Sequence, residues 1–147
     1  MQSDLRDLFK AERKDDTHGV PRRLCARKSH LEERGLKTLP ELLKDPQYVW
    51  CARAASPKMT GGDSYVPASK WANTVAKVDE DELIGLRGQA RHRKLVKLQT
   101  EAVAAFRDSL TPKRIAQAKL ELRGKTLLCW CLPDLPCHTD VLVGLFR

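Results

Sequence analysis

The sequence predicts an α/β protein: a single compact domain with a small mixed or parallel sheet flanked by helices, preceded by a helical N-terminal extension. Three observations predict this class. The chain has 147 residues, 41% of them are hydrophobic and 31% are charged, and short apolar or β-branched runs alternate with segments of helical spacing. A chain of this length buries roughly two-thirds of its unfolded surface, which is enough for one core. We assign residues 1–46 to the extension and residues 47–147 to the α/β domain.

The extension is expected to begin with an amphipathic helix within residues 1–14, because Leu5, Leu8 and Phe9 recur at a spacing of three to four. With Gln2 they also form a pattern similar to the peptide that docks on sliding clamps. A plain amphipathic helix is the alternative interpretation, since anchors at this spacing are common.

A linker is expected near residues 15–23, where Gly19 and Pro21 interrupt any helix. Two short helices should follow it. Capping-box patterns, a hydroxyl residue followed three positions later by Glu, begin at Ser29 and at Thr38.

The α/β domain is expected to contain further strands and helices in alternation. The strands are predicted over residues 48–51, 64–66 and 125–131, and the helices over residues 79–86, 90–110, 111–122 and 137–146. The clearest helix start is Thr111, a good N-cap, followed by Pro112 at the first helical position.

The charge balance favours a polyanionic partner. Twenty-seven Lys and Arg against nineteen Asp and Glu leave a formal net charge of +8, and nucleic acid is the commonest partner of such a chain. The basic residues gather in two clusters: Arg91, Arg93, Lys94 and Lys97, and Arg22, Arg23, Arg27 and Lys28. The alternative interpretation is a solvated basic surface that aids solubility.

The chain is expected to be intracellular, in the cytoplasm or the nucleus, with import into an organelle left open. No apolar run approaches the roughly 20 residues that cross a bilayer, and the N-terminus, which mixes acidic with basic residues and has no continuous apolar stretch, does not resemble a secretory signal. No membrane association is therefore predicted. An odd number of cysteines, five, argues for reduced thiols or metal ligands rather than a disulfide framework.

The most informative motif lies near the C-terminus. A strand alternates faces, so Cys129 and Cys131 should project to one side of it. The turn that follows brings Cys137 and His138 to the start of a helix, beside the carboxyl end of the strand, where open α/β sheets usually bind their ligands. Three thiols and one imidazole are therefore expected near one pocket.

Three interpretations of this cluster remain open. In the first, Cys129, Cys131, Cys137 and His138 bind zinc as a cofactor. Against it, Cys137 and His138 are adjacent, and the side chains of adjacent residues in a helix point about 100° apart. A catalytic site would use Cys137 as the nucleophile, with His138 or Asp140 as its acid/base partner. In the third interpretation the cysteines are small buried hydrophobes, and His138 and Asp140 hydrogen-bond the turn.

The residues of this motif resemble the signature of a known family. Leu-x-Gly-Lys-x-Leu-x-Cys-Trp-Cys over residues 122–131, followed by Pro-Cys-His-x-Asp-Val-Leu over residues 136–142, is similar to the signature of the Domain of Unknown Function 4326 family. The resemblance covers about residues 47–147. It implies that Trp71 and Asn73 belong to a ligand-facing loop, and the family occurs in large DNA viruses among other sources.

Three functions are compatible with these observations. The first is a nucleic-acid-associated module that contacts phosphates through its basic clusters. The second is an enzyme acting on a nucleotide or nucleobase, in which Trp71 would stack on a ring and Asn73 would read a base edge. The third is a non-catalytic subunit of a larger assembly such as a ribonucleoprotein.

Overall fold

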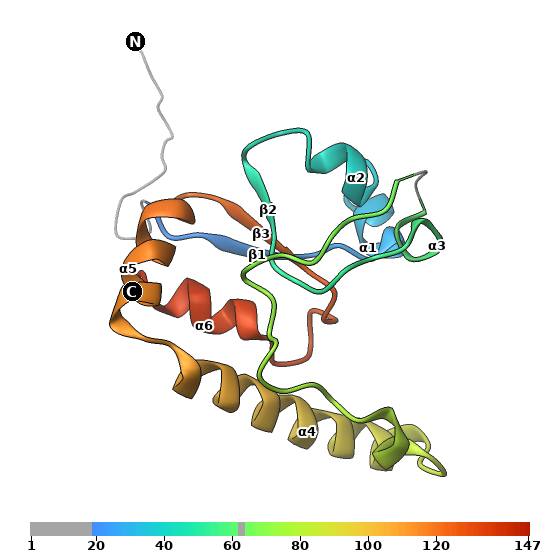
Figure 1. Cartoon of the computed structure of the whole chain (residues 1–147). Helices are drawn as coiled ribbons and strands as arrows, with labels where there is room; N and C mark the ends of the chain where they lie inside the picture. Colours follow the sequence, from blue (N-terminus) through green and yellow to red (C-terminus); the bar gives the residue numbers. More distant parts are fainter. Residues whose placement is uncertain (1–18, 62–63) are drawn as a thin grey trace.

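The computed structural model describes residues 19–61 and 64–147, and its centre is a three-stranded sheet. The strands β1 (Arg22–Cys25), β2 (Tyr48–Trp50) and β3 (Thr126–Cys129) are arranged in the order β1-β3-β2. Both pairings are parallel. All three strands therefore end at the same edge of the sheet (Figure 1).

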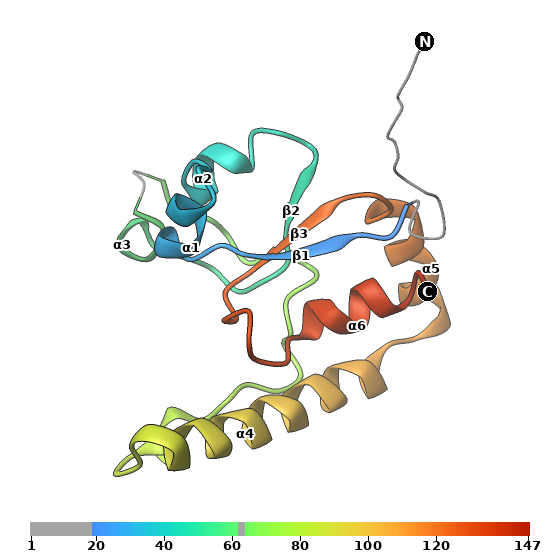
Figure 2. The ribbon, with the colours of Figure 1, turned by 180° about the vertical axis from the view of Figure 1, so that it is seen from behind.

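Helices connect the strands, because a parallel pairing requires the chain to cross back over a face of the sheet. The connecting helices are α1 (Lys28–Glu33), α2 (Leu39–Leu42), α3 (Pro57–Thr60), the 3-10 helix η2 (Glu80–Leu83), α4 (Gly88–Ser109) and α5 (Pro112–Glu121), and α6 (His138–Gly144) follows the last strand. The first two lie on one side of the sheet, whereas α4 and α6 lie on the other (Figures 1 and 2). The α/β class predicted from the sequence is confirmed.

The core has two halves, one on each face of the sheet. Successive side chains of a strand point to opposite faces, so Leu128 belongs to the cluster that contains Leu31 and Leu39, and Leu127 to the cluster that contains Phe106 and Leu142. Both leucines of β3 are fully buried. The central strand is therefore the element that joins the two halves of the core.

Helix α4 is the longest helix that the structure describes, and its first half extends beyond the sheet (Figure 2). Its buried residues, Ala102 and Phe106, both lie in its second half. The first half therefore adds little to the core, and the middle of the helix, with Gln99, Ala102 and Val103, contributes one wall of a surface pocket.

The sheet differs from the prediction in two segments. Residues 22–25 form β1, so the linker expected near residues 15–23 overlaps a strand that pairs with β3. The strand expected over residues 64–66 is wrong, because Val66 makes a single antiparallel bridge with Ala55. Pro67 follows and lacks the N–H that would extend the ladder. The clamp-like motif within residues 1–14 lies outside the described residues.

Two of the three predicted helix caps also differ. The first helix begins at Lys28 with Arg27 as its N-cap, which places Ser29 inside the helix. Thr38 occupies the N-cap of α2, but its side chain accepts no hydrogen bond there. Only the position at Thr111 is capped as expected, with its Oγ1 accepting from the backbone N–H of Arg114 at 3.1 Å.

Removal of this cap gives a first test of the structure. Thr111→Ala is expected to lower the free energy of unfolding by about 1 kcal/mol, because the first turn of α5 loses a hydrogen-bond acceptor. Urea unfolding followed by circular dichroism measures the change. Thr100→Ala is the matched control, since the Thr100 hydroxyl bonds the carbonyl of Val96 within α4 and Ala favours a helix interior. An equal loss in both variants would contradict the assignment of the cap.

The described helices include none that is long and apolar enough to cross a membrane.

Candidate functional site

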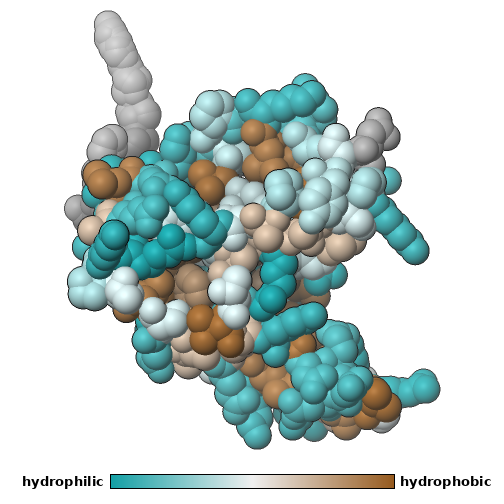
Figure 3. Space-filling model, in the orientation of Figure 1, coloured by the Kyte–Doolittle hydropathy of each residue, from teal (hydrophilic) through white to brown (hydrophobic). Residues whose placement is uncertain are grey.

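A candidate site is a pocket of about 380 Å³ at the carboxyl edge of the sheet. Its walls come from the segments that follow β2 and β3 and from the middle of α4. Its aromatic and polar lining residues include Trp50, Arg53, Asn73, Lys77, Gln99, Trp130, Cys131 and His138. Figure 3 shows the surface hollowed between the protruding end of α4 and the rest of the molecule. This is the position at which open α/β sheets bind ligands.

One side of the pocket combines aromatic rings with cationic groups. Trp50 is mostly buried and donates its indole N–H to the carbonyl of Arg53 at 3.1 Å. The guanidinium of Arg53 donates in turn to the carbonyls of Asn73 and Ala76. The loop after β2 is thereby tied to the segment that leads to η2, and the pocket is held open between them.

Three cysteine sulfurs meet below the pocket. Cys129 ends β3, Cys131 follows in the turn, and Cys137 is the N-cap of α6. Their Sγ atoms all lie within 4.8 Å of one another, and all five cysteines of the chain are free thiols. The convergence expected from the sequence is present. Of the three, Cys131 is the one that also lines the pocket.

The imidazole of His138 lies beside this cluster. Its Nε2 is 2.5 Å from the carbonyl oxygen of Cys51, and its Nδ1 is 3.7 Å from Sγ of Cys137. A carbonyl oxygen only accepts, so the assigned tautomer carries its proton on Nε2 and leaves a lone pair on Nδ1. Burial lowers the pKa of His138, and the ring packs edge-on against Phe106 at 5.1 Å. His138 is therefore a neutral, oriented imidazole.

The thiols of the cluster are not equivalent. Hydrogen bonds from Cys129 and Cys131 hold the pKa of the Cys137 thiol below its usual range, and Thr139 supports them with a hydroxyl 3.1 Å from the same sulfur. The same interactions raise the pKa of Cys131. The cluster thus carries its first negative charge on Cys137. That side chain is fully buried, so its sulfur cannot reach a substrate in the pocket without a rearrangement.

Asp140 lies away from the pocket. Its Oδ2 accepts from the backbone N–H of Cys137 at 3.0 Å and from Arg23 at 2.9 Å. The carboxylate therefore caps α6 and lines a second hollow, together with His30 and Arg34. Of the three residues expected to be catalytic, Cys137, His138 and Asp140, only His138 lines the pocket itself.

The predicted ligand-facing loop is largely occupied by structural contacts. Trp71 is buried in the core, where Arg114 lies 4.2 Å from its ring centroid. Asn73 lines the pocket, but its amide donates to the carbonyl of Ala102 and accepts from the N–H groups of Val75 and Ala76. Little of its hydrogen-bonding capacity is left for a base edge, and Trp71 offers no free face.

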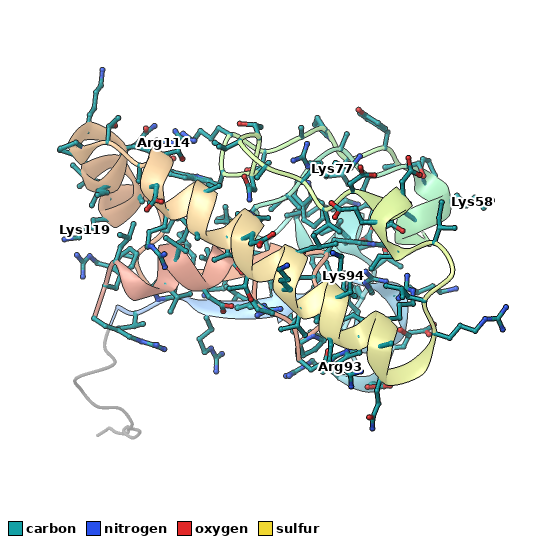
Figure 4. All side chains as sticks on the ribbon, turned by 90° about the horizontal axis from the view of Figure 1, so that it is seen from below. Lys58, Lys77, Arg93, Lys94, Arg114 and Lys119 are labelled. Atoms are coloured by element: carbon teal, nitrogen blue, oxygen red, sulfur yellow. The ribbon has the colours of Figure 1, made fainter. Side chains whose placement is uncertain are left out.

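The two basic clusters have different positions. Arg91, Arg93 and Lys97 are exposed on α4, whereas Lys94 pairs with Glu82 at 3.6 Å. At about 100° per residue, Arg93 and Lys97 lie about 120° and 160° around the helix from Gln99, which lines the pocket. Figure 4 shows Arg93 and Lys94 on the first half of α4, far from Lys119 on α5. The α4 cluster thus faces solvent rather than the pocket.

Part of the other basic cluster turns inward, which sequence reasoning missed. Arg23 donates to the carbonyl of Leu132 at 2.6 Å, and Arg27 donates to the carbonyl of Trp130 at 2.8 Å. The guanidinium of Arg27 also lies 5.4 Å from the Trp130 ring centroid. These two arginines therefore hold the turn after β3. Their positions on either side of the apolar run Leu24-Cys25-Ala26, which is buried, were the available signal.

The fold and the site together define a small parallel α/β protein with a thiol and imidazole cluster beneath a pocket at the carboxyl edge of its sheet. The chain belongs to the family described as Domain of unknown function (DUF4326), whose model matches residues 36–147. The match extends further toward the N-terminus than the resemblance in the sequence motifs and includes α2. Neither the search of curated proteins nor the search of solved structures found a match.

Proposed function

We propose that this chain binds single-stranded nucleic acid and receives one base in the pocket at the carboxyl edge of the sheet. The observation that carries the proposal is the pairing, in one pocket, of the partly exposed ring of Trp130 with the cationic side chains of Arg53 and Lys77. Such a site offers a surface for stacking and charges for the adjoining phosphates.

The dimensions of the pocket support a ligand of this kind. A volume of about 380 Å³ is at the small end of ligand pockets, which span about 300–1,000 Å³. Its apolar floor, from Ala102, Val103 and Cys131, suits the face of a ring. A base inside a duplex is stacked on both faces and paired along one edge, so a single strand is the form that can enter.

The surrounding charge supports a polymer rather than a free nucleotide. Lys58 and Lys77 lie on the half of the molecule that also carries the first half of α4, away from α5 (Figure 4). Arg91, Arg93 and Lys97 extend the positive surface along that helix. Neutralisation of several phosphates by such residues releases counterions, and this gives affinity that depends on salt but little on sequence.

Binding is tested by fluorescence anisotropy with labelled single-stranded RNA, single-stranded DNA and duplex DNA over a range of salt. Trp130→Leu is expected to weaken binding of the preferred single strand by about 1–3 kcal/mol, the worth of one stacked base. The double variant Arg93→Gln, Lys97→Gln is expected to depend less on salt. In a plot of log binding constant against log salt concentration for a single strand, the slope should become shallower by about 0.7 for each phosphate that the variant no longer neutralises.

Lys77→Gln and Lys119→Gln form a matched pair, because both lysines are exposed but only Lys77 lines the pocket. The first should weaken binding and the second should not. Equal affinity of Trp130→Leu and the unmodified chain, at equal thermal stability, would contradict the placement of a base in the pocket. If mononucleotides bound the chain and no oligonucleotide did, the ligand would be a free nucleotide rather than a polymer.

A further inference from the structure

We propose that the chain binds one Zn²⁺ ion through Cys129, Cys131 and Cys137, with Nδ1 of His138 as the fourth ligand. The inference is independent of nucleic-acid binding, since it concerns the cluster beneath the pocket. It assigns a metal centre to three thiols and an imidazole that otherwise have no common role.

The spacing of the sulfurs is close to that of a zinc site. Tetrahedral zinc with Zn–S distances of about 2.3 Å places its sulfur ligands about 3.8 Å apart. The three Sγ atoms lie within 4.8 Å of one another. Movements of less than about 1 Å, within the reach of χ1 rotations, would therefore complete the sulfur part of the site.

The imidazole of His138 lies at the edge of this group: its Nδ1 is close to Cys137 but not within 4.8 Å of all three sulfurs, so the ring would have to move toward Cys129 and Cys131 to bind the same ion. With a Zn–N distance of about 2.0–2.1 Å, a nitrogen and a sulfur on the same tetrahedral ion lie about 3.6 Å apart. The Nδ1 of His138 is 3.7 Å from Sγ of Cys137. When Cys137 is a thiolate, its Sγ and the Nδ1 of His138 each present a lone pair to the other. A cation bound between the two atoms would accept both lone pairs.

The side chains of Cys137 and His138 do not diverge as those of two adjacent residues inside a helix would. Cys137 is the N-cap of α6, and its φ of −142° and ψ of 148° are those of extended backbone. Its side chain therefore does not follow the helical rotation of about 100° per residue. The extended cap directs the sulfur back toward β3, while His138 begins the helix.

The groups around the cluster resemble the outer shell of a metal site. The amide of Gln99 lies 3.2 Å from Sγ of Cys131, and the hydroxyl of Thr139 lies 3.1 Å from Sγ of Cys137. The Nε2–H of His138 donates to the carbonyl of Cys51. A backbone carbonyl bonded to the second ring nitrogen is the usual device that orients a ligating histidine.

The charge balance is consistent with this assignment. Three thiolates and one Zn²⁺ ion leave a net charge of −1, while the protons of the thiols pass to solvent. Arg23 supplies the opposite charge, because its guanidinium interacts with Cys129 and Cys137. Cys131 lines the pocket, which gives an ion a path into a cluster whose other two sulfurs are buried.

The experiment uses the full chain, purified in a reducing buffer, with zinc counted by elemental analysis. Addition of Co²⁺ to the metal-free protein should produce the visible bands of tetrahedral cobalt and a sulfur-to-cobalt charge-transfer band whose intensity grows with the number of thiolate ligands. Each of Cys129→Ser, Cys131→Ser and Cys137→Ser should reduce that band. Each should also weaken zinc binding, measured against a competing chelator, by more than about 100-fold, because loss of a group that only orients a ligand already costs about 10–100-fold.

Cys25→Ala is the matched control, because Cys25 is also buried and pairs beside Cys129 in the sheet but lies outside the cluster. It should leave the charge-transfer band unchanged. His138→Ala should keep the thiolate band and shift the visible bands. Absence of a sulfur-to-cobalt band in the reduced, unmodified chain would overturn the proposal, and this result does not depend on whether any variant folds. Loss of nucleic-acid binding with an intact cobalt spectrum would overturn only the proposed function.

Discussion

Leu128→Ala is expected to lower the free energy of unfolding by about 2–5 kcal/mol, the range for a buried leucine whose cavity is only partly refilled. Leu128 is fully buried in the central strand and packs against the helices that connect β1 to β2. Its neighbour Leu127 is equally buried on the other face. We expect Leu127→Ala to have an effect in the same range, because both faces of this sheet are covered.

Urea unfolding monitored by circular dichroism and by tryptophan fluorescence measures both variants. Leu120→Ala is the matched control, since Leu120 is 85% exposed on α5 and its truncation should change stability by less than about 0.5 kcal/mol. If Leu128→Ala behaved like Leu120→Ala, the sheet would not be buried on the α1 and α2 side.

Phe106→Ala is expected to cost about 3–5 kcal/mol and to loosen α4. Phe106 and Ala102 are the buried residues of this helix, so the ring is the main anchor of one wall of the pocket. It also contacts the imidazole of His138 edge-on. Hydrogen exchange should therefore accelerate in the second half of α4, in addition to the fall in global stability measured by urea unfolding.

Phe106→Leu separates the two contributions of the ring. It keeps an apolar side chain in the core but removes the aromatic contact, which is worth about 0.5–1.5 kcal/mol. We expect a smaller loss of stability, together with a change in the NMR shifts of the His138 ring. Unchanged His138 shifts in this variant would contradict the contact between Phe106 and the imidazole.

Several elements could be predicted from the sequence because their signals are local. The β-branched and aromatic run of β2, the apolar run of β3 and the spacing of α4 each identify an element without reference to a partner. The Thr-Pro start of α5 specifies its cap directly. The convergence of Cys129, Cys131 and Cys137 followed from a strand, a turn and a helix in succession, and the family resemblance arose from the same segment.

The remaining features depend on contacts between distant parts of the chain. Four residues beginning with two arginines do not by themselves indicate a strand, and β1 exists because β3 pairs with it. Arg23 and Arg27 belong to the site because the turn after β3 offers them carbonyl groups, whereas composition alone places arginines on the surface. Asn73 does not have its expected role because backbone groups occupy its amide.

The sequence by itself therefore determined the class of the fold, most of its elements and the group of thiols at its candidate site. The tertiary structure alone decided which polar groups face the pocket, which are consumed by the backbone, and how close Nδ1 of His138 comes to Cys137. The physical reason is that propensity and periodicity act within one segment, whereas hydrogen-bond partners and the orientation of a buried side chain are set by whichever segments pack together.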